Sequence, residues 1–273
     1  MCIYYFDNLS ELKRDISDVI TDENVIIKIQ NLTDEDVINN IDILQKIQSL
    51  DLIKTNVKKI PKELVNLQYL CFSGSEGITE IPKELVNLIT LECHDSHIKK
   101  IPKELINLQS LYCSSSDIIE IPKELVNLKT LDCLKTKITE MPKELVNLQE
   151  LYCTETLIKE IPKELVNLRY LDCSNTNITE IPKELVNLCV LNCSNTQIKE
   201  IPKELVKLQE LHCSNTQITK ISKELIMLNI LYCNGSQITE IPKELINLKI
   251  IYNTNYRTSV IELDSLKIKN DKR

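Results

Sequence analysis

Eight cysteines at one recurring position are the residues of this 273-residue chain whose type and spacing could do chemistry. They follow one another at a constant interval: Cys93, Cys113, Cys133, Cys153, Cys173, Cys193, Cys213 and Cys233. A thiolate is a nucleophile and a metal ligand, and two thiols can form a disulfide. On neighbouring strands, about 4.8 Å apart, such side chains would point in parallel rather than toward each other. We therefore expect buried, reduced thiols that act as small apolar core residues, with a redox-responsive thiol protein as the alternative.

A second candidate for chemistry is the cluster of Cys93, His94, Asp95 and His97. These residue types suit zinc, but a zinc site needs about four convergent ligands. Cys93 is expected to point into the core and His97 lies beyond the following turn, so we expect no metal and no other cofactor. The chain has 3 histidines and no evident set of acid, base and nucleophile, and the stretch after Asn247 is too short for a separate catalytic domain. We do not expect an enzyme.

The element that positions these residues is a repeat built on the stretch IPKELVNL. Its prolines are evenly spaced from Pro82 to Pro202, Ser222 takes the next place, and Pro242 resumes the pattern. One unit reads LxxLxCxxTxIxxIPKELVN, and its positions are counted here from the first leucine. The LxxLxC part alternates like a short strand with one buried face, and PKEL suits a tight turn or a single helical turn. Because one unit cannot bury its own apolar edge, the fixed period predicts a solenoid of stacked coils.

The unit resembles the leucine-rich repeat, whose usual form is LxxLxLxxNxLxxLPxxLxxL, in its short intracellular kind. The resemblance covers residues 47–247. It implies a β-rich α/β fold, a right-handed horseshoe solenoid with a parallel sheet on the concave side and short turns or single helical turns on the convex side. Two positions depart from the family pattern, with Cys for Leu at the sixth and Thr or Ser for Asn at the ninth. The chain is also similar to repeat proteins of giant DNA viruses of amoebae.

The hydroxyl column at the ninth position is predicted to turn inward. There it would bond backbone groups that the bend leaves unpaired, in place of the family's asparagine. A hydroxyl has one donor where an amide has two, so this column should satisfy fewer backbone groups. The Lys-Glu pair of PKEL is expected to form a solvated outer face.

The outward positions of the predicted strands, chiefly the fifth and the third, differ from coil to coil and are rich in tyrosine and carboxylates. Tyrosine rings on a rigid sheet offer a large contact area at low entropic cost. We predict that the following residues bind a partner on the concave face: Glu92, Tyr112, Asp132, Glu150, Tyr152, Tyr170, Asp172, His212 and Tyr232. An idle polar face is the alternative.

Charge, hydropathy and cysteine usage narrow the possible partners. The net charge of -7 and the pI of about 5.2 argue against nucleic acid, which needs a basic stripe. A membrane span needs a run of about 18 apolar residues, and the sequence has no such run. The first residues, MCIYYFDNLSELKRD, carry charges where a signal peptide needs an apolar core. Because 11 cysteines without an export signal suggest a reducing compartment, we expect a cytoplasmic protein, in the host-cell cytoplasm if it is viral.

The sequence predicts three parts: an N-terminal cap over 1–46, ten repeats over 47–247, and a C-terminal cap with a charged tail over 248–273. The N-terminal cap would cover the apolar edge and the unpaired strand of the first coil. The segment VIELDSL in the third part is expected to fold back over the last coil, and the charged residues after it are expected to be disordered.

Local signals predict the elements of the cap and one irregular coil. A helix is expected over 9–20, a strand over 24–30 and a second helix within 33–47. In the second coil, one extra residue in SGSEGI predicts a bulged turn, in which Gly74 and Gly77 can take positive φ without penalty.

These patterns predict a noncatalytic scaffold that recognises a protein partner on its concave face. The acids beside the tyrosines imply a partner with a basic patch, and the chain is expected to be a monomer that binds neither nucleic acid nor membrane. The alternative from another class is an expanded structural array with no specific ligand.

Overall fold

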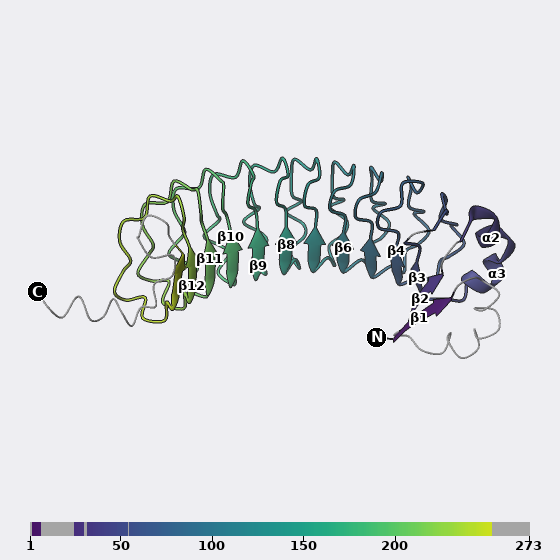
Figure 1. Ribbon diagram of the computed structural model, residues 1–273, viewed down its shortest axis with the longest axis horizontal. Helices are drawn as coiled ribbons and strands as arrows, with labels where there is room; N and C mark the ends of the chain where they lie inside the picture. Colours follow the sequence, from purple (N-terminus) through teal and green to yellow (C-terminus); the bar gives the residue numbers. More distant parts are fainter. Residues whose placement is uncertain (1, 7–24, 30–31, 54, 253–273) are drawn as a thin grey trace, which may run out of the picture. The chain divides into compact units, whose positions relative to one another are not determined.

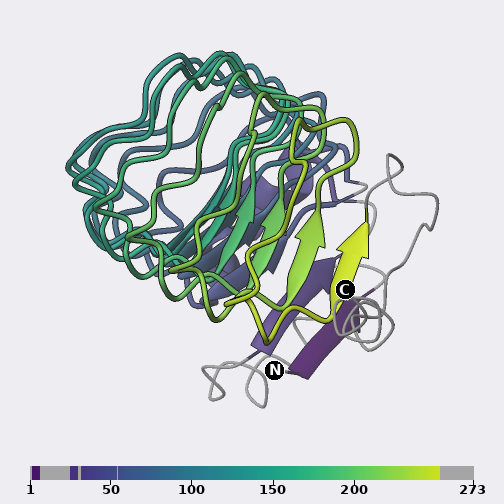
Figure 2. The same ribbon diagram turned by 90° about the vertical axis from the view of Figure 1, so that its left-hand side faces the viewer.

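The computed structural model describes residues 2–6, 25–29, 32–53 and 55–252. The chain forms two compact units, Met1–Ile138 and Thr139–Arg273. In both units, short parallel strands lie side by side and the connecting segments loop away from them on one side (Figure 1). The end-on view of Figure 2 shows that the return segments of successive coils follow nearly the same path. The predicted solenoid of stacked coils is confirmed.

The first unit contains strands β1 to β7, which follow one another in sequence order and run parallel. Their bounds are β1 Cys2–Phe6, β2 Val25–Ile29, β3 Ser49–Asp51, β4 Tyr69–Cys71, β5 Thr90–Glu92, β6 Ser110–Tyr112 and β7 Thr130–Asp132. Helices α2 (Asp34–Asn39) and α3 (Ile41–Leu44) lie between β2 and β3 in the sequence. The register advances by one repeat from β5 to β6, as in Leu91 opposite Leu111.

The second unit, by itself, has the same kind of arrangement, with strands β8 to β13. Their bounds are β8 Glu150–Tyr152, β9 Tyr170–Asp172, β10 Val190–Asn192, β11 Glu210–His212, β12 Ile230–Tyr232 and β13 Ile250–Tyr252. Each pairs in parallel with the next one along, in a register that again shifts by one repeat. Paired residues on neighbouring strands lie one repeat apart in the sequence. Each position of the repeat therefore forms a row of side chains across the strands.

The core of each unit consists of the inward columns of the repeat. From Leu64 to Ile238, the side chains at the leucine, cysteine and isoleucine columns are at most 7% exposed. The tight turn after each proline brings the next leucine inward, as in Leu105, whose N–H donates to the Pro102 carbonyl at 3.2 Å. Each coil thus contributes one layer of apolar side chains that packs against the layers of its neighbours.

The ninth-position hydroxyls turn inward, as predicted. Nine of them donate to the backbone carbonyl three residues earlier, as in Ser96 Oγ to Cys93 O at 2.6 Å. The same bond is made by Thr55, Ser116, Thr136, Thr156, Thr176, Thr196, Thr216 and Ser236. Each bond lies within one coil, so this column fixes the bend after the strand without joining neighbouring coils.

An asparagine column at the twentieth position joins the coils instead. The Asn107 side chain donates from Nδ2 to the Val86 carbonyl of the preceding coil at 2.9 Å. Equivalent bonds are made by Asn66, Asn87, Asn127, Asn167, Asn187 and Asn247. Where Lys207 replaces asparagine, its Nζ donates to Asn187 Oδ1 at 2.7 Å, so a contact to the preceding coil is kept.

The turn after each of the strands β4 to β12 contains one residue in the left-handed region. Asp95 has φ of 48°, and Asn215 has φ of 56° at the same eighth position. Gly74 takes φ of 71° in the irregular second coil, as predicted. Gly77 does not have positive φ, so that part of the prediction is wrong. Its constraint is a close approach, because a Cβ there would lie 2.9 Å from Lys58 Cγ of the preceding coil.

A column of valine and isoleucine at the nineteenth position remains exposed in every described coil. Val166 is 40% exposed and Ile226 is 52% exposed, whereas the neighbouring leucine at the eighteenth position is fully buried. The column has these members: Val65, Val86, Ile106, Val126, Val146, Val166, Val186, Val206, Ile226 and Ile246.

The N-terminal predictions are confirmed in part. The strand expected over 24–30 is β2, but the helix expected within 33–47 is divided at Asn40, which ends α2 and precedes α3. Thr33 begins α2 with a capping box to Asp36, which satisfies free backbone donors there. The helix expected over 9–20 and the elements expected after Tyr252 lie outside the described residues. The division into two caps and ten repeats stays a prediction.

No helix within the described part of the chain has the length and apolar character needed to cross a membrane.

Candidate functional site

The outward third and fifth positions of the strands form what we call the sheet face, the side predicted to be concave. In the first unit, Glu92, Tyr112 and Asp132 are half-buried and follow one another in register across β5, β6 and β7. The Tyr112 ring lies beside His94, with ring centroids 5.8 Å apart. His94 Nδ1 is in turn hydrogen-bonded to Ser114 Oγ. The structure thus brings the three predicted residues of this unit together in one row.

In the second unit, the sheet face carries a pair of tyrosine rings. Glu150 lies opposite Tyr170, and Tyr152 lies opposite Asp172, across β8 and β9. The rings of Tyr152 and Tyr170 contact each other with centroids 4.7 Å apart at an interplanar angle of 32°. Burial, followed by the neighbouring carboxylate of Asp172, raises the pKa of Tyr170 above its usual value. This pair is an aromatic surface in a negatively charged setting.

Asp172 is held by a network of its own unit rather than left open on the surface. Its Oδ1 accepts from Thr154 Oγ1 at 2.8 Å, Ser174 Oγ at 2.7 Å and the Ser174 N–H at 3.0 Å. Its Oδ2 accepts from Asn192 Nδ2 at 3.1 Å. Thr154 and Ser174 are themselves buried. The carboxylate therefore organises the loop edge beside the strands, a role that its outward position did not predict.

A second aromatic contact of this unit lies on β11 and β12. The rings of His212 and Tyr232 are stacked, with centroids 4.3 Å apart and an interplanar angle of 13°. His212 Nε2 is hydrogen-bonded to Glu210 Oε1 at 2.6 Å. The predicted residues of the second unit thus form two groups, one around Tyr152 and Tyr170 and one around His212 and Tyr232.

The sheet face does not continue unchanged to β3 and β4. Asp51 and Cys71 occupy the outward fifth position there, yet they are 2% and 0% exposed. Asp51 pairs with Lys28 of β2 at 2.6 Å between Oδ2 and Nζ. Burial raises the pKa of the Cys71 thiol to about 11. The expectation that the whole fifth column is outward and accessible is therefore wrong for these two coils.

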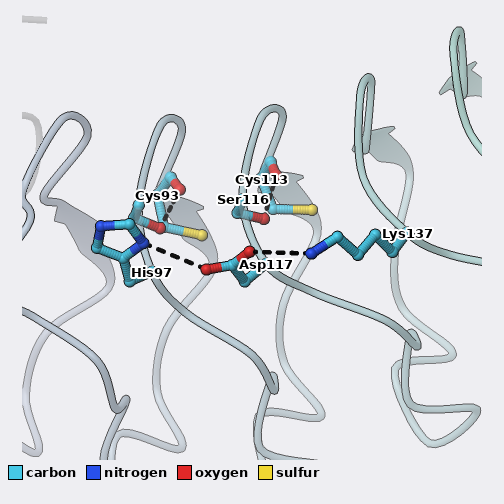
Figure 3. A network of polar contacts seen from close by, with 7 residues as sticks. Cys93, His97, Cys113, Ser116, Asp117 and Lys137 are labelled. Carbon is cyan, nitrogen blue, oxygen red and sulfur yellow. Dashed lines mark hydrogen bonds and ion pairs between the residues drawn. The ribbon is translucent and has the colours of Figure 1, made fainter.

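The cysteine column lies in the core, and none of its members forms a disulfide. Cys93 and Cys113 point in the same direction rather than toward each other (Figure 3). Burial raises the pKa of Cys93, Cys113 and Cys133, and also that of Cys173, Cys193 and Cys213. A thiol that keeps its proton and lies away from solvent is a poor nucleophile and a poor metal ligand. The predicted structural role of these residues is supported by both facts.

The side chains of the considered zinc cluster point to different places. Cys93 is buried, whereas His97 lies on the surface and contacts Asp117 at 3.2 Å between Nδ1 and Oδ2 (Figure 3). Lys137 contacts the other oxygen of Asp117 at 3.5 Å. The pKa of Asp117 is lowered, chiefly by the hydrogen bond from His97 and to a smaller extent by the one from Lys137. Within the described residues, no group of three or more His, Cys, Asp or Glu is placed to hold a metal ion.

Two family models match the repeats of the second unit. The model described as Leucine Rich Repeat matches residues 167–188, and the model described as Leucine Rich repeats (2 copies) matches residues 186–225. The chain thus contains leucine-rich repeats. No curated protein sequence matches it significantly. The predicted similarity to proteins of giant DNA viruses stays a prediction.

Solved structures share the leucine-rich repeat fold. The functional domain of InlJ from Listeria monocytogenes, which includes a cysteine ladder, has a TM-score of 0.69 and 23% identity over 83% of this chain. Internalin InlF from the same organism has a TM-score of 0.67 and 22% identity over 91% of this chain and 90% of its own. Internalin C2, also from Listeria monocytogenes, has a TM-score of 0.53 and 26% identity over 71% of this chain and 84% of its own. This chain covers 56% of the InlJ chain.

Three features of this chain were not singled out from the sequence. The twentieth-position asparagines and the exposed nineteenth-position column were visible as constants of the repeat, because VN or IN recurs in nearly every coil. The Asp172 network had a weaker signal, since Ser174 lies two residues along the chain but Thr154 and Asn192 become partners only when neighbouring coils align.

Proposed function

We propose that this leucine-rich repeat protein is a noncatalytic scaffold that binds a protein partner on the sheet face of its coils. The observation that carries the proposal is the contrast between columns of one repeat. Inward and return-segment columns are nearly constant, whereas the fifth position holds Tyr, Asp, Glu, Asn and His in coils that otherwise share their sequence. Duplication copies all columns alike, so the fifth position has diverged since the coils arose.

The chemistry of the varied positions suits a protein surface. Tyr112, Tyr152 and Tyr170 are half-buried, so each ring is already ordered while part of it faces solvent. An ordered ring loses little conformational entropy when a partner covers it. Leucine-rich repeats commonly serve as protein-interaction scaffolds, and internalin-like proteins of this fold are generally noncatalytic.

The charges of the sheet face favour a partner with a basic patch. Glu150 is exposed, and Glu92 and Asp132 are half-buried beside Tyr112. Carboxylates near aromatic anchors accelerate association with a basic partner, and the rate falls as salt rises. The proposal includes a monomeric protein that binds neither nucleic acid nor membrane and works in a reducing cytoplasm, where its thiols stay reduced.

The test compares two double variants in capture of partners from the native cell. Tyr112→Ala with Tyr152→Ala removes two anchors and should lower affinity for a captured partner roughly thirtyfold or more. Lys143→Ala with Lys163→Ala alters the return segments, away from the sheet face, and should leave affinity unchanged. Binding that survives the tyrosine change but not the lysine change would place the interface elsewhere. Failure of the unchanged protein to capture any partner would favour a structural array without a ligand.

A further inference from the structure

The second unit places one exposed carboxylate beside two contacting tyrosine rings. Glu150 is the exposed residue of β8, and it lies directly opposite Tyr170 of β9. The ring of Tyr170 lies 4.7 Å from that of Tyr152, centroid to centroid. We infer that the site formed by Glu150, Tyr152 and Tyr170 binds an arginine side chain of the partner. This inference rests on the proposed function and names the group that the sheet face recognises.

The surroundings of the ring pair select a cation. The third and fifth positions of strands β8 to β12 include Glu150, Asp172 and Glu210 but neither lysine nor arginine. A tyrosine ring presents the negative face of its quadrupole to a cation, and a nearby carboxylate adds to that attraction. An acidic or phosphorylated group would meet repulsion from the same carboxylates.

Glu150 is the carboxylate of this group that is available to a ligand. Both oxygens of Asp172 accept hydrogen bonds from side chains of its own unit. Glu210 is bonded to His212 at 2.6 Å. In the described part of the chain, Glu150 forms no hydrogen bond or ion pair with another side chain, so a guanidinium would gain its charge without breaking an existing contact.

The combination of a flat ring surface and a carboxylate favours arginine over lysine. A guanidinium is planar, so it can stack on a tyrosine ring while its N–H groups pair with both oxygens of one carboxylate. The lysine ammonium is compact and strongly hydrated. It has no flat surface, so it cannot stack on the ring while it pairs with both oxygens of the carboxylate. The Asp172 network fixes the strand position opposite Tyr152, so the ring pair is held ready before binding.

The site can be tested without the partner, using N-acetyl-arginine N-methylamide as the probe. The full chain is labelled with ¹³C in its tyrosine rings, and Tyr152→Phe and Tyr170→Phe variants assign the two signals. Titration should shift the Tyr152 and Tyr170 signals in a saturable way and leave the signals of the other tyrosines unshifted. The matching citrulline compound, which has nearly the same shape but no charge, should cause no such shifts.

Two variants measure the separate contributions to this affinity. Glu150→Gln removes the charge at nearly constant shape and should weaken the probe about threefold. Tyr170→Leu removes the ring and should weaken it about fivefold or more. Lys163→Ala on a return segment of the same unit is the control, which should leave probe affinity unchanged. The melting temperature of each variant shows whether the fold is retained.

Equal binding of the citrulline compound, tighter binding of the lysine analogue, or shifts confined to other tyrosines would each overturn the arginine assignment. A partner whose capture depends on Tyr112 and Tyr152 but not on the charge of Glu150 would also overturn it, while the proposed function would stand. If the arginine probe bound at Tyr170 but partner capture did not depend on the tyrosines, only the proposed function would be contradicted.

Discussion

The fifth and sixth positions of each coil are neighbours in sequence, but they belong to two different regions of the molecule. The sixth-position cysteines lie in the core, are fully buried, and recur in eight coils. The fifth position lies on the sheet face and is half-buried in most coils, with side chains that differ from coil to coil. The residue type with the greater intrinsic reactivity is thus the one that the fold makes inert.

The reason is the environment rather than the residue type. Burial disfavours the thiolate and raises the pKa of the core thiols, so the cysteine column behaves as apolar packing. Tyrosine has no comparable reactivity, but its ring is ordered and partly open on the sheet face. In this fold, the direction of the side chain decides whether it packs in the core or lies on the sheet face, where we propose that a partner binds.

The largest effect that would test this contrast is a loss of stability at alkaline pH. Six core thiols have a raised pKa in the folded chain, whereas an unfolded chain releases these protons near pH 8.5. Above that pH the unfolded state binds fewer protons, so stability that is fully present below it falls by about 1.4 kcal/mol per pH unit for each thiol.

Urea unfolding between pH 8.0 and 9.5 measures this slope, and Cys113→Ala with Cys193→Ala serves as the control. The double variant should show a shallower slope, because two of the titrating groups are absent. A slope equal to that of the unchanged chain would mean that the thiols do not control alkaline stability.

Replacing two residues that are neighbours in sequence, one in each region, should have smaller effects on stability. The core replacement should cost more than the sheet-face replacement. Cys113→Ser places a hydroxyl in the core, where it can lack a partner, and should cost about 1 to 3 kcal/mol. Tyr112→Ala removes a half-buried ring from the sheet face and should cost less than about 1 kcal/mol. Chemical denaturation of both variants measures the difference. If the tyrosine change were the costlier one, the sheet face would have to be counted as part of the core.

Asp172 breaks the simple contrast, and its replacement should have a smaller effect than Cys113→Ser. Asp172→Ala removes the acceptor that Thr154, Ser174 and Asn192 share and should cost about 1 to 2 kcal/mol. Asp132→Ala is the matched control in the first unit, since its Oδ1 accepts only from the Leu134 N–H at 3.2 Å among the described contacts. Equal free energies of unfolding for the two variants would show that the network adds no stability.

Most of the fold follows from the repeat itself. The spacing of the prolines fixes the register, and the leucine, cysteine and isoleucine columns fix the inward face, because each coil must match its neighbours in volume. The inward hydroxyls were predictable for the same reason, since Thr136 and its equivalents recur with the bend that they bond. Gly77 was misread because its close approach to Lys58 depends on the preceding coil and not on its own turn.

The candidate site could be predicted only as a set of outward positions. The alternation of the strand was enough to place Tyr112, Tyr152 and Tyr170 on one kind of surface. It was not enough to show that Cys71 is buried, or that the Tyr152 and Tyr170 rings contact each other.

The sequence by itself determined the period, the inward columns and the list of side chains on the sheet face, because these depend only on residue type and on spacing along the chain. The tertiary structure alone decided which of those side chains stay available. Asp172 and Glu150 have the same charge and similar outward positions, yet donors from adjacent coils hold Asp172 and leave Glu150 exposed. That difference arises because hydrogen bonds join atoms that lie about one repeat apart in the chain, and only the alignment of neighbouring coils brings those atoms within reach.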